Sequence, residues 1–217
     1  MSTILAVDAP TYIVLAADLR YTKHTGPTFV GSSKVFQVTE DAYISYTGAA
    51  YWDAWVMNLV ENAPKRLADI PIPEKYMWEV DAEAARDMKW FFDRRPETDF
   101  DIDPPTVVIA TPRGIFLMDA CTIVKVQTYQ IGELELAVVG EGSGGELAKG
   151  AFSGALFGLG EDFLQSSDFL ISAVEQAIRI AALSDPHTGG GISIRMFPKV
   201  MDPSRTIIVD PSDEEVH

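Results

Sequence analysis

The chain has a single cysteine, Cys121, among its 217 residues. An internal disulfide is therefore impossible, and a reducing compartment fits this usage, so we expect a cytoplasmic protein. Histidine is also scarce: His24, His187 and His217 are scattered and form no ligand cluster, so we expect no metal. No apolar run reaches membrane-spanning length, and no basic segment followed by an apolar one opens the chain, so neither a membrane anchor nor a signal peptide is expected.

Positively charged residues are also few compared with negatively charged ones. Seventeen Lys and Arg residues face 32 Asp and Glu residues, which gives a formal net charge of −15. Such a surface repels phosphate backbones and anionic lipids, so we expect neither nucleic acid nor a membrane as partner. The length is enough for a sizeable core, and we expect residues 1–217 to form a single domain, with residues 210–217 as a loose acidic tail.

Short apolar and β-branched runs alternate in blocks with helical patterns. The runs predict strands at residues 3–7, 12–18, 34–38, 43–48, 106–112, 114–120, 133–140, 192–200 and 206–210. Helical periodicity predicts helices at residues 49–67 and 79–94, from about residue 143, and at residues 167–184. Because short turns join the first strands into hairpins and the helices come in pairs, we expect an α+β fold with antiparallel sheets instead of a βαβ fold.

One glycine-rich stretch, "VVGEGSGGELAKGAF" at residues 138–152, has two interpretations. Its G-x-G-x-x-G matches a dinucleotide-binding loop, with Glu161 or Asp162 as the acid that binds the ribose. However, no strand pattern precedes those acids, and the motif lies two-thirds of the way along the chain. We therefore favour a helix start whose Ser143 serves another site, and we expect no cofactor.

The N-terminus suggests what that site is. Ser2 directly follows the initiator methionine, and serine is small enough for a methionine aminopeptidase to remove Met1. The α-amine that this exposes has a reference pKa of about 7.7–8.0, so a useful fraction is unprotonated at neutral pH. Such an amine can take the proton from the hydroxyl of its own residue and activate it as a nucleophile.

Ser2 is followed by Asp18, Lys34 and Gly48, each in a short motif. In these residues and their spacing the sequence resembles the proteasome β-subunit family, including the HslV-type peptidases, which are N-terminal nucleophile hydrolases. With Ser2 in place of the terminal threonine of that family, one register without gaps puts its aspartate on Asp18 in "LAADLRYT" and its lysine on Lys34 in "SSKVF". The oxyanion-hole glycine falls on Gly48 in "SYTGAAYWDA". This resemblance covers most of the chain.

Two later motifs continue the resemblance. "GEGSGGELAKGAF" matches the G-S-G-G stretch of the family, with Ser143 as its serine, and "DPHTGGG" matches D-x-x-S/T-G-G, with Asp185 and Thr188. The resemblance implies that these three side chains orient the α-amine of Ser2. It also implies a group of substrate-binding residues, namely Tyr21, Thr22, Ser32, Tyr46 and Ala50.

The resemblance further implies a four-layer αββα sandwich and a self-compartmentalising peptidase that takes peptides or unfolded proteins. We expect a homo-oligomeric ring of six or seven subunits, in one layer or two, and leave open whether an ATPase feeds it. The aromatic-rich patterns at residues 49–67 and 79–94 are interpreted as subunit contacts, although side chains that all pack inward would give the same periodicity.

Plainer interpretations remain for each residue alone. Asp18, Ser143 and Asp185 are typical of helix caps and turns, and the stretch around Ser2 is typical of a disordered terminus. Serine in place of threonine lacks the methyl group that restricts the rotamer, which predicts slower turnover. Two other functions stay open: an amidohydrolase for a small amide or a dedicated peptide, and a ring or shell protein without catalysis.

Overall fold

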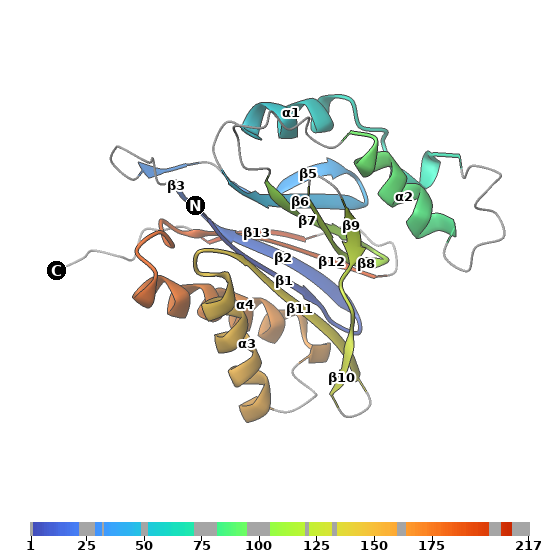
Figure 1. The fold of residues 1–217 in the computed structure, drawn as a ribbon. Helices are drawn as coiled ribbons and strands as arrows, with labels where there is room; N and C mark the ends of the chain where they lie inside the picture. Colours follow the sequence, from blue (N-terminus) through green and yellow to red (C-terminus); the bar gives the residue numbers. More distant parts are fainter. Residues whose placement is uncertain are drawn as a thin grey trace.

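The computed structural model describes residues 2–21, 29–31, 33–48, 52–71, 82–94, 105–119, 122–131, 134–159, 164–199 and 205–209. Two antiparallel sheets lie face to face, and a pair of helices covers the outer face of each sheet (Figure 1). The expected α+β fold, a four-layer αββα sandwich, is therefore confirmed.

The first sheet has six strands in the spatial order β10-β11-β1-β2-β12-β13. Their bounds are β1 Thr3–Asp8, β2 Tyr12–Asp18, β10 Tyr129–Ile131, β11 Leu134–Gly142, β12 Ile192–Pro198 and β13 Arg205–Val209. All neighbours are antiparallel, and β1 and β2 form the hairpin that the sequence predicts. The first strand of the chain therefore lies inside the sheet, held on both sides by β11 and β2.

The second sheet has five strands in the order β5-β6-β7-β8-β9. Their bounds are β5 Phe36–Thr39, β6 Ala42–Thr47, β7 Thr106–Thr111, β8 Gly114–Met118 and β9 Ile123–Lys125. A separate two-stranded ribbon joins β3 (Arg20–Tyr21) to β4 (Phe29–Val30). The predicted hairpin of β5 and β6 is confirmed, whereas β3, β4, β9 and β10 were missed because two or three residues show no alternation.

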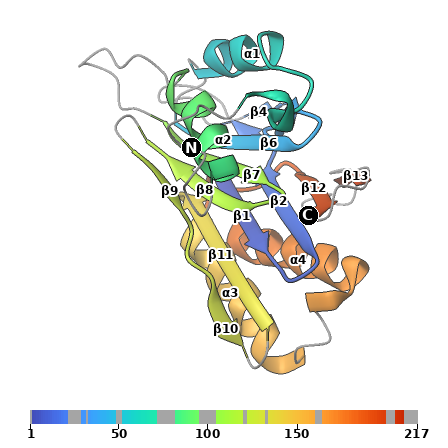
Figure 2. The same ribbon diagram turned by 90° about the vertical axis from the view of Figure 1, so that its right-hand side faces the viewer.

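Within the described ranges, four α-helices form the two outer layers (Figures 1 and 2). They are α1 Asp53–Glu61, α2 Ala82–Phe92, α3 Gly145–Leu159 and α4 Ser167–Ser184, with a short 3₁₀ helix, η2, at Leu67–Asp69. The single helix predicted at residues 49–67 was too long. The helix ends before Pro64 because proline cannot donate a backbone hydrogen bond and disfavours helical geometry in the residue before it. No helix among the described residues is long and apolar enough to span a membrane.

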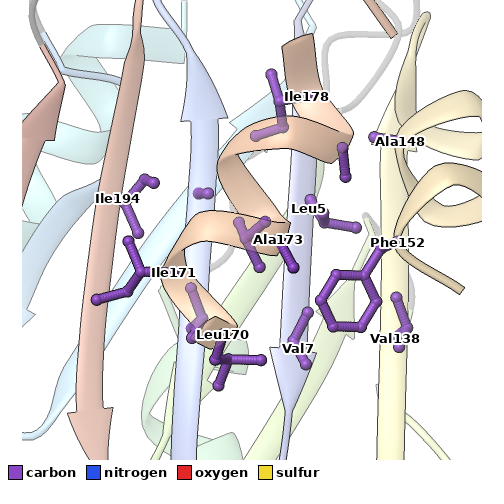
Figure 3. Packing of buried hydrophobic residues seen from close by; sticks show 14 of the residues in the cluster. Leu5, Val7, Val138, Ala148, Phe152, Leu170, Ile171, Ala173, Ile178 and Ile194 are labelled. Atoms are coloured by element: carbon purple, nitrogen blue, oxygen red, sulfur yellow. The ribbon is translucent and has the colours of Figure 1, made fainter. Parts of the chain in front are cut away.

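Alternation along the strands builds three apolar layers between the four structural layers. In β1, Leu5 and Val7 face α3 and α4, whereas Ile4 and Ala6 face the second sheet. Figure 3 shows Leu5 and Val7 beside Phe152 of α3 in the first of these layers. Because both faces of β1 are packed, the residues at its start are held in place, which matters for the site below.

The aromatic side chains of α1 and α2 do not form the outer surface that we expected. Trp52, Val56, Leu59, Trp90 and Phe91 are all buried against the second sheet. The alternative interpretation, in which these side chains pack inward, is right for these residues. A five-stranded sheet covered by two short helices has room for large side chains, which periodicity alone does not reveal.

Five of the eight exposed large apolar side chains among the described residues lie instead on the other helix pair. Phe157 of α3 is 90% exposed and Leu183 of α4 is 86% exposed. The remaining exposed members of this group are Leu147, Phe169 and Ile180. All five side chains come from α3 and α4, whose inner faces cover the six-stranded sheet, so this helix pair carries apolar side chains away from the sheet as well as toward it.

Candidate active site

Antiparallel pairing brings strand ends together at one edge of the six-stranded sheet. Thr3 opens β1 and pairs with Gly142, the last residue of β11. Asp18, the last residue of β2, pairs with the first residue of β12. Ser2 extends this pairing, because its carbonyl accepts a hydrogen bond from the backbone N–H of Ser143 at 3.1 Å. Residues far apart in the sequence therefore meet around Ser2.

A buried ion pair occupies one side of this edge. Asp18 is fully buried and Lys34 is 2% exposed. The Asp18 Oδ1 atom accepts hydrogen bonds from Lys34 Nζ at 3.0 Å and from the Thr3 N–H at 2.8 Å, while Oδ2 accepts the Gly189 N–H at 3.1 Å. Lys34 also donates to the carbonyl of Arg20. Asp18 thus ties the lysine to the residue that directly follows Ser2.

Lys34 is electrostatically unusual. Burial lowers the pKa of its ammonium below the ordinary value, while the Asp18 carboxylate opposes the shift by attraction and hydrogen bonding, and the Arg20 cation adds to the lowering. A cation at this position lowers the pKa of a neighbouring amine or hydroxyl. A lysine with a lowered pKa also releases its proton more readily than a surface lysine does.

A second polar group lies on the other side of the edge, centred on Asp185. Its Oδ2 atom accepts hydrogen bonds from Ser143 Oγ at 2.7 Å and Thr188 Oγ1 at 2.6 Å, and its Oδ1 atom accepts the His187 N–H at 3.1 Å. Burial acts to raise the pKa of Asp185, but these hydrogen bonds outweigh it and hold the pKa below its usual range. Asp185 is therefore a carboxylate at neutral pH.

Thr3 joins the two groups, and sequence reasoning missed it. Its backbone N–H binds Asp18, and its buried hydroxyl contacts Thr188 Oγ1 and accepts the Gly144 N–H at 3.1 Å. Alternation offered a signal, since Thr3 lies on the same face of β1 as the apolar Leu5. A polar residue at such a position needs hydrogen-bond partners.

Glycines make the close approach to Ser2 possible. A Cβ atom on Gly142, whose φ is +85°, would lie 1.7 Å from the Ser2 carbonyl oxygen, and one on Gly144 would lie 2.5 Å from the Thr3 hydroxyl. Gly140 packs equally closely against Gly145. Because β11 is antiparallel to β1, the stretch lacks the parallel βαβ context of a dinucleotide-binding loop. Its glycines serve tight packing against the start of β1.

Gly48 follows β6 on the second sheet. Its φ is +135°, a conformation that favours glycine, and a Cβ atom there would lie 3.3 Å from Trp52 Cδ1. The preceding residue, Thr47, has its methyl group 3.1 Å from the position of a Cβ on Gly142. The end of β6 therefore approaches the same edge, from the opposite sheet.

The predicted substrate-binding residues are described in part. Tyr46 is buried among apolar side chains, is stacked on Phe36 at 6.3 Å between ring centroids, and donates a hydrogen bond to Asp53, which sequence reasoning did not single out. Tyr21 belongs to the β3–β4 ribbon by its backbone. Three positions lie outside the described residues, namely Thr22, Ser32 and Ala50. Within the described part of the chain, no group of three metal-ligating side chains occurs.

No family model matches the sequence, and no curated protein matches it either. Solved structures match the fold. The eukaryotic HslV from Trypanosoma brucei is 17% identical with a TM-score of 0.57, and the match covers 90% of this chain and 99% of that one. BPH from Thiobacillus denitrificans is 19% identical with a TM-score of 0.60, covering 92% and 100%. BPH in complex with epoxomicin is 17% identical with a TM-score of 0.59, covering 92% and 100%.

These likenesses extend over nearly the whole of each chain. The chain therefore has the proteasome-type and HslV-type fold, in which two antiparallel sheets lie between helix pairs. At such low identity the likeness shows the fold alone, so the function has to be argued from the site.

Proposed function

We propose that the chain is an N-terminal nucleophile peptidase that uses Ser2, after removal of Met1, to hydrolyse peptide bonds. One observation carries the proposal: two buried polar groups meet at Thr3, the residue after the nucleophile. The Asp18 group binds its backbone N–H, and the Asp185 group contacts its hydroxyl through Thr188. The desolvation of the Lys34–Asp18 pair costs stability, and the proposal gives this pair a task in catalysis.

The chemistry assigns one task to each group. The free α-amine of Ser2 takes the proton from the Ser2 hydroxyl, and the oxygen attacks the substrate carbonyl. Lys34 favours this step because its positive charge lowers the pKa of the amine and the hydroxyl. The N–H of Gly48 donates to the oxyanion of the tetrahedral intermediate, a contribution worth about 3 kcal/mol in comparable enzymes. The intermediate then collapses to an ester as the C–N bond breaks, and the leaving amine takes the proton from the Ser2 ammonium. Water, deprotonated by the same amine, hydrolyses the ester, releases the acid and restores Ser2.

Ser143 orients the amine. Its hydroxyl proton is donated to Asp185, so its oxygen has only lone pairs left for a neighbour. An N–H of the α-amine donates to that oxygen, which directs the nitrogen lone pair toward the Ser2 hydroxyl. Thr188 is fixed in the same way by its own hydrogen bond to Asp185.

Processing gives the first test. The intact mass of protein made in a normal cell should be lower than that of the full sequence by one methionine, because the catalytic amine must be free. Epoxomicin, the compound bound in the BPH complex, should add to the processed chain, with Ser2 as the modified residue. Digestion and mass spectrometry locate the adduct. A uniformly retained Met1 would contradict the peptidase proposal.

The substrate class rests on the same site and needs a separate measurement. We propose peptides and unfolded proteins, and a small-molecule amide is the alternative because it would use the same nucleophile. Degradation of a long unfolded protein, followed by gel electrophoresis, distinguishes the two. If only small amides are cleaved, Ser2 remains the proposed nucleophile, but the substrate is a small-molecule amide instead of a peptide or unfolded protein.

We also propose that the chain assembles into a ring of six or seven subunits, in one layer or two. The exposed apolar side chains of α3 and α4 support this, because exposed large side chains such as Phe157 and Leu183 are costly in water. A closed ring would enclose a chamber, so that only unfolded chains could reach the nucleophile. We also propose a cytoplasmic location, which fits the single cysteine of the chain.

Assembly is tested by charge introduced on this helix pair. Phe157→Glu combined with Leu183→Glu should dissociate the oligomer, because burying each carboxylate in an apolar contact costs several kcal/mol. Val124→Glu is the matched control, since Val124 is 58% exposed but lies on β9 and should leave the assembly intact. Light scattering of the native protein gives the mass. If the wild type is a monomer and still hydrolyses peptides, the proposed ring is refuted, while the proposed hydrolysis by Ser2 is not affected.

A further inference from the structure

A chain of hydrogen bonds runs beneath the proposed nucleophile, on the side of the sheet that faces α3 and α4. It begins at the Gly144 N–H, passes through the hydroxyls of Thr3 and Thr188, and ends at the Asp185 carboxylate, where Ser143 also donates. Thr3 and Thr188 are both buried, so bulk water does not compete with these contacts. The mechanism proposed above uses every member of this chain except Gly144 and Thr3.

The proton positions follow from the two ends of the chain. A backbone N–H can only donate and a carboxylate can only accept, so Gly144 and Asp185 fix the direction. Thr188 gives its single proton to Asp185 Oδ2, and the Thr3–Thr188 contact therefore has Thr3 as the donor. Each hydroxyl in turn donates toward the carboxylate, an arrangement in which neighbouring hydrogen bonds strengthen one another.

We propose that Thr3 is a positioning residue for the nucleophile, whose hydroxyl fixes this chain so that Asp185 stays ionised and Ser143 stays an acceptor for the Ser2 amine. The inference rests on the proposed function and deepens it. Thr3 acts through Thr188 and does not itself touch substrate. Its backbone N–H, held by Asp18 Oδ1, keeps the residue in register while the hydroxyl acts.

Other charged groups around Asp185 are unchanged when only the Thr3 hydroxyl is altered. His187 belongs to the same loop and donates its backbone N–H to Asp185. Arg20 donates to the carbonyl of Pro186 at 2.9 Å, and Asp18 holds the loop through the Gly189 N–H. The Lys34 cation is paired with Asp18, and this pairing does not involve the Thr3 hydroxyl. A change in the ionisation of Asp185 in a Thr3 variant would therefore report the hydrogen-bond chain.

The experiment compares Thr3→Val, which keeps the shape and removes the hydroxyl, with Thr3→Ser, which keeps the hydroxyl. Carboxyl-carbon NMR follows the titration of Asp185 independently of activity, and an electrophilic peptide probe follows the labelling rate of Ser2 against pH. Thr3→Val should raise the pKa of Asp185, move the acid limb of labelling to higher pH, and slow labelling by about five- to tenfold, the value of one hydrogen bond. Thr3→Ser should resemble the wild type in all three.

Two results would overturn the proposal. An Asp185 titration in Thr3→Val that matches the wild type would show that the hydroxyl does not act on the carboxylate, and an equal loss in Thr3→Ser would assign the effect to the methyl group. If Thr3→Val does not fold, Thr188→Val cuts the same chain one step along and must move the Asp185 titration in the same direction. If the wild type is never labelled at Ser2, while Thr3→Val still raises the pKa of Asp185, the proposed function is refuted and the effect of Thr3 on Asp185 stands.

Discussion

Ser2→Ala should abolish peptide hydrolysis and covalent labelling, with a loss of at least about 10⁴-fold, which is the scale seen when a nucleophile is removed from a hydrolase. The variant removes one hydroxyl from a residue that is 7% exposed and whose carbonyl is held by the Ser143 N–H. The fold should therefore persist, with an unchanged melting temperature. Steady-state hydrolysis of a fluorogenic peptide and labelling at saturating probe measure the effect.

Ser45→Ala is the matched control for this variant. Ser45 is fully buried on β6, and its hydroxyl has no hydrogen-bond partner within the described part of the chain. Its removal should leave activity unchanged and stability equal or higher, because an unpaired buried hydroxyl costs about 1–3 kcal/mol. Ser2→Thr should preserve or raise the rate, since the added methyl group restricts the side-chain rotamer. Full activity in Ser2→Ala would refute the assignment of the nucleophile.

Much of the architecture could be predicted from the sequence, because strand alternation and short turns are local signals. The pattern in "TILAV" and "YIVLAAD" predicts a hairpin, and the register found, Val7 with Val14, is set by the burial of both faces of β1. The positions of Asp18, Lys34 and Gly48 followed from resemblance in one register. The hydrogen bond between Asp18 and Lys34, and the approach of the end of β6 to Gly142, are contacts between parts of the two sheets that no local sequence pattern displays.

Other features depend on contacts that no local pattern encodes. The aromatic side chains of α1 and α2 have the same helical spacing whether they face a sheet or a neighbour, so the interpretation as an outer surface was wrong for Trp52, Trp90 and Phe91. The role of Thr3 depends on contacts 141 and 185 residues away in the chain. The hydrogen bond between Tyr46 and Asp53 joins a strand to a helix start and was missed for the same reason.

Lys34→Met should remove activity and also lower the free energy of unfolding by about 3–5 kcal/mol, the usual cost when one partner of a buried ion pair is lost. The reason is that Asp18 is fully buried and burial raises the pKa of its carboxyl, so without the cation 3.0 Å away the carboxylate is either left unpaired or has to take up a proton. Urea unfolding gives the stability, and peptide hydrolysis at a temperature where the variant is folded gives the activity. Wild-type activity in a folded Lys34→Met protein would show that the cation has no part in activating Ser2.

Two companion variants separate the structural effect from the catalytic one. Lys199, whose side chain is 28% exposed, pairs with the buried Asp8 at 2.5 Å, at the far end of β1 from Ser2, so Lys199→Met takes the cation from another buried carboxylate away from the site. It should lower stability and leave kcat/KM unchanged. Asp18→Asn combined with Lys34→Met removes both charges and should recover part of the stability, because no unpaired carboxylate remains, while hydrolysis stays absent. Recovery of hydrolysis with stability in the double variant would mean that the pair serves folding only, and that Ser2 is activated by its own amine without a neighbouring cation.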